Sequence, residues 1–191
     1  MKRLTAILLA IMLICTGALA FSSCNGADDS AESKTEAATK PQPKPAEVPD
    51  GYKEYNNGDI SFAYPSSWVL TDGSTVLISE KADGGNNITV AYEATNEIYK
   101  DLTTDKYLEL VKPSLDAMGM KVSGVTITQT KNEYDQGITK ITQTMTVSSV
   151  TMSQTLYVIN SNGRSYTVTV TEVTKDANIV KNVFDTLVAL K

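Results

Sequence analysis

Apolar and polar residues alternate through much of the chain, and this period of two is typical of β-strands with one buried face. In residues 165–173, Tyr166, Val168 and Val170 alternate with serine and threonine. We expect the threonine-rich side to face solvent, because threonine combines a β-branched carbon with a hydroxyl. Further strands are predicted at 60–64, 76–79, 88–92, 125–130, 139–148 and 151–159. One-sided burial favours antiparallel pairing, and Asn-Ser-Asn-Gly at 160–163 predicts a turn.

The period changes to that of a helix at two places. The first has apolar residues spaced by three, four and three positions: Leu108, Val111, Leu115 and Met118. Thr103 or Thr104 can cap the start of this helix, and Gly119 can end it. Pro113 predicts a kink or an early end. We favour a helix because the apolar stripe continues beyond the proline.

The second helix is predicted to begin near Asp176, which can cap it, and to run to the C-terminus. One face of this helix is apolar and consists of Val180, Val183, Phe184 and Leu187. The predicted order is therefore strands, helix, strands, helix. This order indicates an α+β fold, in which a mainly antiparallel β-sheet is partly covered by two helices.

The N-terminal segment shows neither the strand period of two nor the spacing of an amphipathic helix. Lys2 and Arg3 precede an apolar run at 4–21, which is the layout of a secretory signal. Phe-Ser-Ser-Cys at 21–24 resembles the lipobox of bacterial lipoproteins. The resemblance implies a signal peptide at 1–23, a lipid on Cys24, and attachment to the outer face of the cell membrane. Two alternatives stay open: an uncleaved membrane anchor, and ordinary cleavage after Ala-Leu-Ala at 18–20.

Residues 24–50 are predicted to consist of the lipidated cysteine and a disordered tether rich in proline, alanine, glutamate and lysine. From residue 25 onwards this segment has no aromatic residue, and Val48 is its only β-branched aliphatic residue. It cannot bury enough apolar surface to offset the entropy lost on ordering. Pro41, Pro43 and Pro45 favour an extended chain. The remaining residues, 51–191, have a suitable length for one domain with a single core.

Charge and composition exclude several classes of function. The chain has a net charge of −5, and removal of Lys2 and Arg3 with the signal peptide leaves 15 basic and 22 acidic residues. Nucleic acid is therefore not an expected partner, because its binding requires basic patches. The sequence has no histidine, so Ser-His-Asp and Cys-His catalysis and imidazole ligands for zinc are excluded.

One stretch points to a family. Ile-Ser-Phe-Ala-Tyr-Pro-Ser-Ser-Trp at 60–68, the hairpins and helix that follow, and Val-Phe-Asp-Thr-Leu-Val-Ala-Leu at 183–190 together resemble the PsbP-like superfamily. This group contains photosystem II extrinsic subunits, a Ran-binding nuclear adaptor and bacterial lipoproteins. The resemblance implies an α/β/α sandwich at 51–191 and an accessory or adaptor role, and it transfers no catalytic residue.

Three sets of residues are candidates for a site. Tyr64 and Trp68 can line a ligand surface, or they can fill the end of the sheet. The Asp-Gly-Gly-Asn-Asn run at 83–87 offers oxygens to Ca²⁺, although a hairpin turn is the favoured interpretation. Five acidic residues can form a carboxylate pair or a patch for a basic partner, or an ordinary solvated face: Glu93, Glu97, Asp101, Asp105 and Glu109.

The sequence predicts a lipid-anchored accessory domain outside the cytoplasm that binds a protein or another ligand of the cell envelope and catalyses no reaction. No catalytic residue, metal site or cofactor is predicted. Two alternatives remain: a carrier of a small molecule or metal ion, and an enzyme that uses carboxylates.

Overall fold

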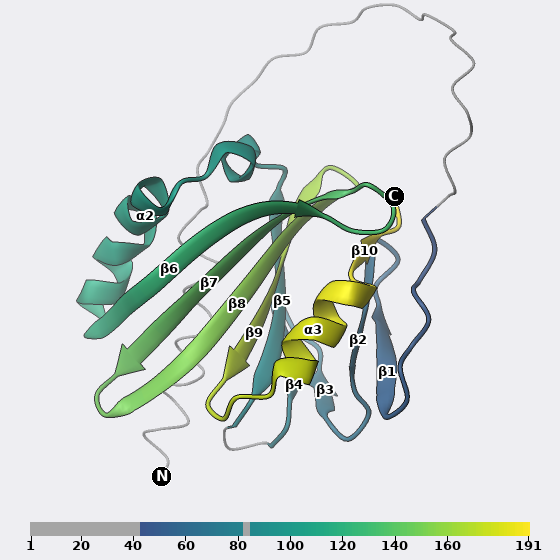
Figure 1. The fold of residues 1–191 in the computed structure, drawn as a ribbon, viewed down its shortest axis with the longest axis horizontal. Helices are drawn as coiled ribbons and strands as arrows, with labels where there is room; N and C mark the ends of the chain where they lie inside the picture. Colours follow the sequence, from purple (N-terminus) through teal and green to yellow (C-terminus); the bar gives the residue numbers. More distant parts are fainter. Residues whose placement is uncertain (1–42, 82–84) are drawn as a thin grey trace, which may run out of the picture.

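The computed structural model of the chain describes residues 43–81 and 85–191 (Figure 1). The predicted signal peptide at 1–23, Cys24, the tether up to residue 42 and part of the 83–87 loop lie outside these residues. Within the described ranges, no helix is long and apolar enough to cross a membrane.

Two antiparallel sheets form the framework (Figure 1). The larger has the order β3-β4-β5-β9-β8-β7-β6. Its strands are β3 (Val69–Thr71), β4 (Val76–Ser79), β5 (Asn87–Ala94), β6 (Met120–Lys131), β7 (Gly137–Val147), β8 (Val150–Ser161) and β9 (Arg164–Glu172). The smaller has the order β1-β2-β10, with β1 (Tyr52–Asn56), β2 (Ile60–Pro65) and β10 (Val188–Ala189). Every strand pair is antiparallel, as the period of two predicted.

Within the described residues, three helical segments accompany the sheets: η1 (Glu97–Asp101), α2 (Thr104–Ala117) and α3 (Ala177–Thr186). Both predicted caps are confirmed, since the Thr103 side chain accepts from the Lys106 N–H and the Asp176 side chain accepts from the Asn178 N–H. Helix α3 lies in front of the larger sheet and beside β2, whereas α2 lies at the β6 edge (Figure 1). The predicted α+β class is confirmed.

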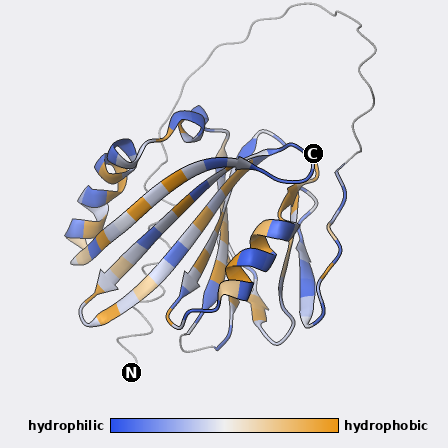
Figure 2. Cartoon of the chain, in the orientation of Figure 1, coloured by the Kyte–Doolittle hydropathy of each residue, from blue (hydrophilic) through white to orange (hydrophobic). Residues whose placement is uncertain are grey.

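Strands β5, β8 and β9 are buried on both faces over most of their length, and a core lies on each side of the larger sheet. The alternation of apolar and polar residues along β6–β9 is visible in Figure 2. Ile78 and Val168 belong to the core shared with the smaller sheet and α3. Met145 and Leu156 belong to the core on the opposite face, beneath η1 and α2. The larger sheet is thus the middle layer, and its strand alternation decides which core each residue enters.

The prediction that the threonine side of 165–173 faces solvent is wrong. Four residues on this side of β9 are buried: Ser165, Thr167, Thr169 and Thr171. The reason is topological, because β9 is the central strand of the seven and lies between β5 and β8. Polar partners offset part of the cost of burial: the Ser165 hydroxyl accepts from the Asn96 N–H at 3.0 Å, and Gln154 donates to Thr171 at 3.2 Å.

The predicted helices differ from the structure in detail. Helix α2 continues through Pro113 to Ala117, and its buried residues are Tyr107, Val111 and Leu115. The predicted stripe is wrong at both ends, since Leu108 is only half-buried and Met118 is 37% exposed at the C-cap.

The second helix was predicted to reach the C-terminus, and this is also wrong. Leu187 has extended backbone angles after α3, and β10 pairs with β2 instead. Gln136 also binds the backbone of β10: its side chain donates to the Ala189 carbonyl and accepts from the Ala189 N–H.

Candidate functional site

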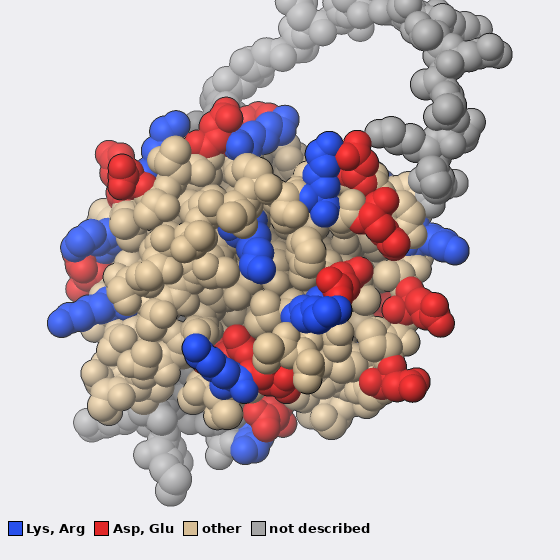
Figure 3. Space-filling model, in the orientation of Figure 1, with Lys and Arg blue, Asp and Glu red and all other residues tan. Residues whose placement is uncertain are grey.

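An open groove of about 580 Å³ lies on the larger sheet next to α3. Strands β7 and β8 form its floor, α3 forms one wall, and Gly124 of β6 lies at the other side. Figure 3 shows this face: uncharged side chains cover most of the surface over β6–β8, and charged side chains lie around it and along α3.

The floor is lined by hydroxyl groups because of the strand register. Thr142 of β7 pairs with Thr155 of β8, and Thr144 pairs with Ser153, so all four side chains point to one face. Thr142, Thr144 and Ser153 are half-buried, and Thr155 is buried. Each hydroxyl can both donate and accept a hydrogen bond, so the floor suits a polar ligand.

A buried polar ladder supports this floor from the opposite face of the sheet. The Tyr107 hydroxyl of α2 donates to Gln143 at 2.8 Å, Gln143 donates to Gln154 at 2.9 Å, and Gln154 donates to Thr171. These bonds connect α2 with three adjacent strands in a region of low dielectric. Satisfied buried networks of this kind rigidify a structure.

Helix α3 is fixed to the floor by Tyr157. The Tyr157 hydroxyl donates to the Val180 carbonyl at 3.0 Å, and its ring lies 5.5 Å from the ring of Phe184. Burial raises the pKa of Tyr157 well above its ordinary value, so the hydroxyl remains protonated as a donor. The wall of the groove therefore has an apolar, aromatic base.

Lysines provide most of the charge of the groove. The Lys140 ammonium lies 5.8 Å from the ring centroids of both Tyr157 and Phe184. Lys175 and Lys181 line the groove as well, and Lys181 forms an ion pair with Asp185. Among the described residues that line the groove, Glu172 is the one acidic residue, and its carboxylate accepts from the Asp176 N–H at 2.7 Å.

A second, smaller cavity of about 300 Å³ lies near η1. Its polar side chains already bind each other and the backbone: Gln129 and Thr139 both donate to the Tyr99 carbonyl, at 2.8 and 2.9 Å. These bonds join η1 to β6 and β7. The polar side chains that line this cavity therefore have a structural role, which is to hold η1 against the sheet.

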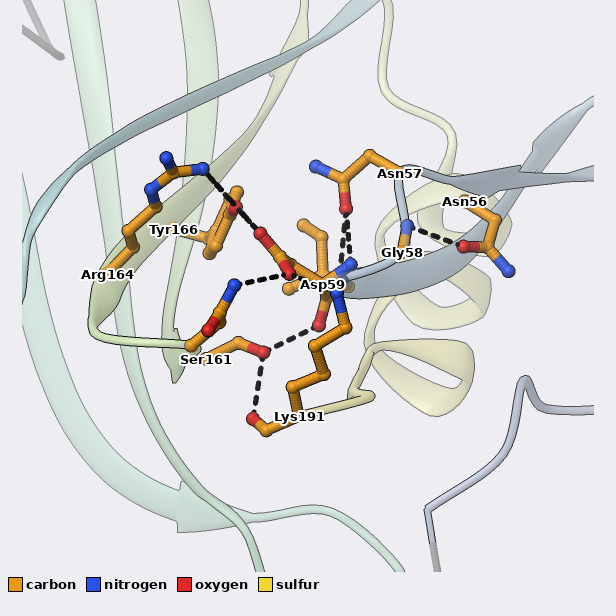
Figure 4. A network of polar contacts seen from close by, with 10 residues as sticks. Asn56, Asn57, Gly58, Asp59, Ser161, Arg164, Tyr166 and Lys191 are labelled. Atoms are coloured by element: carbon orange, nitrogen blue, oxygen red, sulfur yellow. Dashed lines mark hydrogen bonds and ion pairs between the residues drawn. The ribbon is translucent and has the colours of Figure 1, made fainter.

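Asp59 is the centre of a polar network that joins distant parts of the chain (Figure 4). Its carboxylate accepts from the Tyr166 hydroxyl at 2.5 Å, from Asn162 at 3.0 Å and from Lys191 at 3.1 Å, and Arg164 lies 3.6 Å away. The hydrogen bond from Tyr166, followed by that from Lys191, lowers the pKa of Asp59.

The backbone of Asp59 takes part in the same network. Its carbonyl accepts from the Ser161 hydroxyl at 2.6 Å and from the Leu190 N–H at 2.8 Å. The network thus joins the β1–β2 turn, the β8–β9 hairpin and the C-terminus. Its role is structural, since every element it connects belongs to the framework and Asp59 does not line the groove.

Tyr64 and Trp68, the predicted candidates for ligand binding, are 4% and 5% exposed. Both belong to the core beneath α3 and the smaller sheet, and Lys53 donates to the Trp68 carbonyl at 3.0 Å. Neither ring presents a surface to a ligand. Their burial supports the alternative interpretation, in which they fill the end of the sheet.

The predicted acidic residues do not come together in a cavity. Glu93 accepts from the Tyr99 hydroxyl at 2.7 Å, and burial raises the pKa of Glu93. Glu97 pairs with Lys100 on the surface, and Asp101 and Asp105 are exposed. Neither cavity described above is lined by any of these residues. In the part of the chain that the structure describes, no group of three or more metal-binding side chains occurs.

Sequence reasoning missed the groove residues. Lys140 and Thr142 belong to the strand predicted at 139–148, and residues two positions apart in a strand share a face. Contact between that face and Phe184 depends on how α3 returns across the sheet, which the period of the sequence does not specify.

Comparisons with known proteins place this geometry in context. A family model described as PsbP matches residues 50–189. The structure is similar to cyanobacterial PsbP (CyanoP) from Synechocystis sp. PCC 6803, with 13% identity, a TM-score of 0.54, and coverage of 83% of this chain and 98% of that chain. At this identity the likeness concerns the fold alone.

LpqN of Mycobacterium tuberculosis, described as involved in cell envelope biogenesis, has 17% identity and a TM-score of 0.36. That match covers 71% of this chain and 90% of LpqN. A search of the curated proteins found no match.

Proposed function

The chain belongs to the PsbP family, and from this premise we propose that its folded domain is a binding domain of the cell envelope that catalyses no reaction. A lipid on Cys24 holds it at the outer face of the membrane, and the tether allows the domain to reach a protein or another envelope ligand. The ligand lies in the groove beside α3.

The groove itself carries this proposal. Its volume is within the range of binding sites for small ligands or short segments of a polymer. Hydroxyl groups, lysines and the Phe184 ring converge on it, and the ladder from Tyr107 to Thr171 holds the floor in place. A preformed floor reduces the entropy lost when a ligand binds.

A carboxylate enzyme is less well supported by the same geometry. Hydrolysis by paired carboxylates requires two of them on either side of the substrate bond. In the part of the chain that the structure describes, the groove lining contains one, Glu172, whose carboxylate accepts a hydrogen bond from the backbone at the start of α3. Glu93, whose pKa is raised by burial, does not line the groove.

Crosslinking in cells tests the proposal. A benzophenone amino acid would replace Thr142 on the groove floor, with Thr71 on the exposed edge strand β3 as the matched control. We expect adducts from position 142 that are absent from position 71, and fewer of them when Cys24→Ser releases the protein from the membrane. Absence of an adduct at position 142, or the same adducts at both positions, would contradict a ligand in the groove.

A further inference from the structure

The groove is positively charged although the protein is acidic. The whole chain has a net charge of −5, yet the groove lining contains three lysines and one glutamate. Helix α3 adds to this charge, because its first residue, Ala177, lines the groove, and the N-terminal end of a helix carries a partial positive charge. The groove therefore favours a ligand of opposite sign.

Lys140 has an unusual environment for a lysine. It is half-buried in the middle of β7, with its ammonium 5.8 Å from the Tyr157 and Phe184 ring centroids. Aromatic rings attract a cation, but they replace only part of its hydration. No ion pair of Lys140 occurs among the described residues. An anion in the groove would provide the missing counter-charge.

The other charged side chains of the groove differ in whether they already have a partner within the protein. Lys181 pairs with Asp185 along α3, whereas Lys175 is exposed and forms no ion pair within the described ranges. Glu172, the only acidic residue that lines the groove within the described ranges, accepts a hydrogen bond from the Asp176 N–H. Lys140 and Lys175 are therefore the two cations that a ligand can use.

The floor beneath these cations indicates the kind of molecule to which the negative groups of the ligand are attached. Thr142, Thr144 and Ser153 are half-buried hydroxyls that point into the groove. Hydroxyls of a ligand can exchange hydrogen bonds with them, since both groups donate and accept. Phe184 adds an apolar surface at the wall for the carbon skeleton.

Resting on the proposed function, we infer that the ligand of this groove is a sugar or polyol chain that carries phosphate or carboxylate groups. Lys140 and Lys175 bind the anionic groups, and the hydroxyls of the floor bind the chain. Ion pairs with lysine ammonium groups are charge-assisted hydrogen bonds, which are about twice as strong as neutral ones.

Titration of the full-length protein with defined probes tests the inference. Trigalacturonate carries carboxylates, a glycerol phosphate trimer carries phosphates, and maltotriose is neutral. We expect at least one anionic probe to shift the NMR signals of Thr142 and Thr144 and to bind at least tenfold more tightly than maltotriose. Lys140→Gln should weaken that binding about tenfold, which corresponds to about 1.4 kcal/mol. Added salt should weaken it further.

Lys106→Gln is the matched control, because Lys106 is an exposed residue of α2 and does not line the groove. Comparison of the two anionic probes distinguishes a phosphate source from a carboxylate source. Equal binding of maltotriose, binding that Lys140→Gln leaves unchanged, or no binding of either anion would overturn the inference. Adducts at position 142 in cells would then still support a ligand in the groove, so failure of the inference is distinguishable from failure of the proposed function.

Discussion

The hydroxyl of Tyr166 donates a 2.5 Å hydrogen bond to the carboxylate of Asp59, 107 residues earlier in the chain. Tyr166 belongs to the larger sheet, and Asp59 precedes β2 of the smaller sheet. Both residues are buried. This bond therefore holds the two sheets together at a point where water competes little with it.

Tyr166→Phe removes the donor of this bond, together with the longer 3.4 Å hydrogen bond that the same hydroxyl accepts from Arg164. We expect the free energy of unfolding to fall by about 1–2 kcal/mol, since a hydrogen bond to a charged group contributes more than a neutral one. Denaturant unfolding followed by circular dichroism measures the change. Tyr92→Phe is the control, because Tyr92 is 56% exposed and packs on the Tyr166 ring with centroids 5.5 Å apart. An equal loss in both variants would contradict the role of the Asp59 bond.

Asp59→Asn should destabilise the protein in a pH-dependent way. The hydrogen bonds from Tyr166 and Lys191 lower the pKa of Asp59 in the folded state, whereas an unfolded Asp has a pKa of about 3.9. A group with a lowered folded pKa contributes stability that is fully present above its unfolded pKa. That stability is lost as the pH falls through the folded pKa.

The difference between wild type and Asp59→Asn should therefore be largest at neutral pH and shrink below about pH 4. Unfolding curves at pH 7, 5, 4 and 3 measure this difference. Asp116→Asn is a suitable control, because Asp116 forms an exposed pair with Lys112 on α2 and exposed pairs contribute little. A constant difference across this pH range would show that the Asp59 charge is not what stabilises the network.

Sequence periodicity predicted the elements that have long, one-sided patterns. Strands β7, β8 and β9 were found because ten or so residues alternate in each. The short strands β1, β3 and β10 and the η1 turn were missed. Val188 and Ala189, for example, form a strand only because β2 lies beside them, and a pattern of two residues carries no information about such a partner.

The threonine side of β9 shows a second limit. Thr169 has the same local pattern whether it lies in a central or an edge strand, but strand order decides its burial. The residues of the groove are missed for the same reason. Thr142 and Phe184 come together through tertiary packing, and neither is unusual in its own stretch of sequence.

Gly124 lies in β6 at the edge of the groove, where the register with β7 shifts between Ser123 and Thr126. Its φ of +61° is one that residues with a side chain rarely adopt. Gly124→Ala should cost about 1 kcal/mol, because alanine is strained in this conformation.

Gly137→Ala is the matched control, since Gly137 begins β7 without a positive φ and a Cβ there would meet nothing within 4 Å. We expect this change to be neutral, or stabilising by up to about 1 kcal/mol, because alanine reduces the entropy of the unfolded chain. Thermal unfolding of both variants measures the difference. Equal effects would contradict backbone strain at Gly124.

Asp176→Ala removes the cap at the start of α3, where the Asp176 side chain accepts from the Asn178 N–H at 3.0 Å. Loss of such a cap costs about 1 kcal/mol. Thr103→Ala should cost a similar amount at α2, since the Thr103 hydroxyl accepts from the Lys106 N–H at 3.3 Å. Only Asp176→Ala should also increase amide hydrogen exchange along the groove wall. Equal exchange along α3 in both variants would show that this cap does not order the wall.

The proposed attachment to the membrane depends on one sulfur atom, that of Cys24. The two chains of a diacylglyceryl group bury enough CH₂ groups, at about 0.8 kcal/mol each, to hold a protein stably where one chain is marginal. Cys24→Ser removes the attachment point, so we expect the protein to move from the membrane fraction to the medium or the soluble envelope fraction. Cys15→Ser, within the predicted signal peptide, is the control and should leave the protein in the membrane fraction. If Cys24→Ser remained with the membrane, the apolar run at 4–21 would be an uncleaved anchor. If wild type were already soluble, cleavage after residues 18–20 would be the correct interpretation.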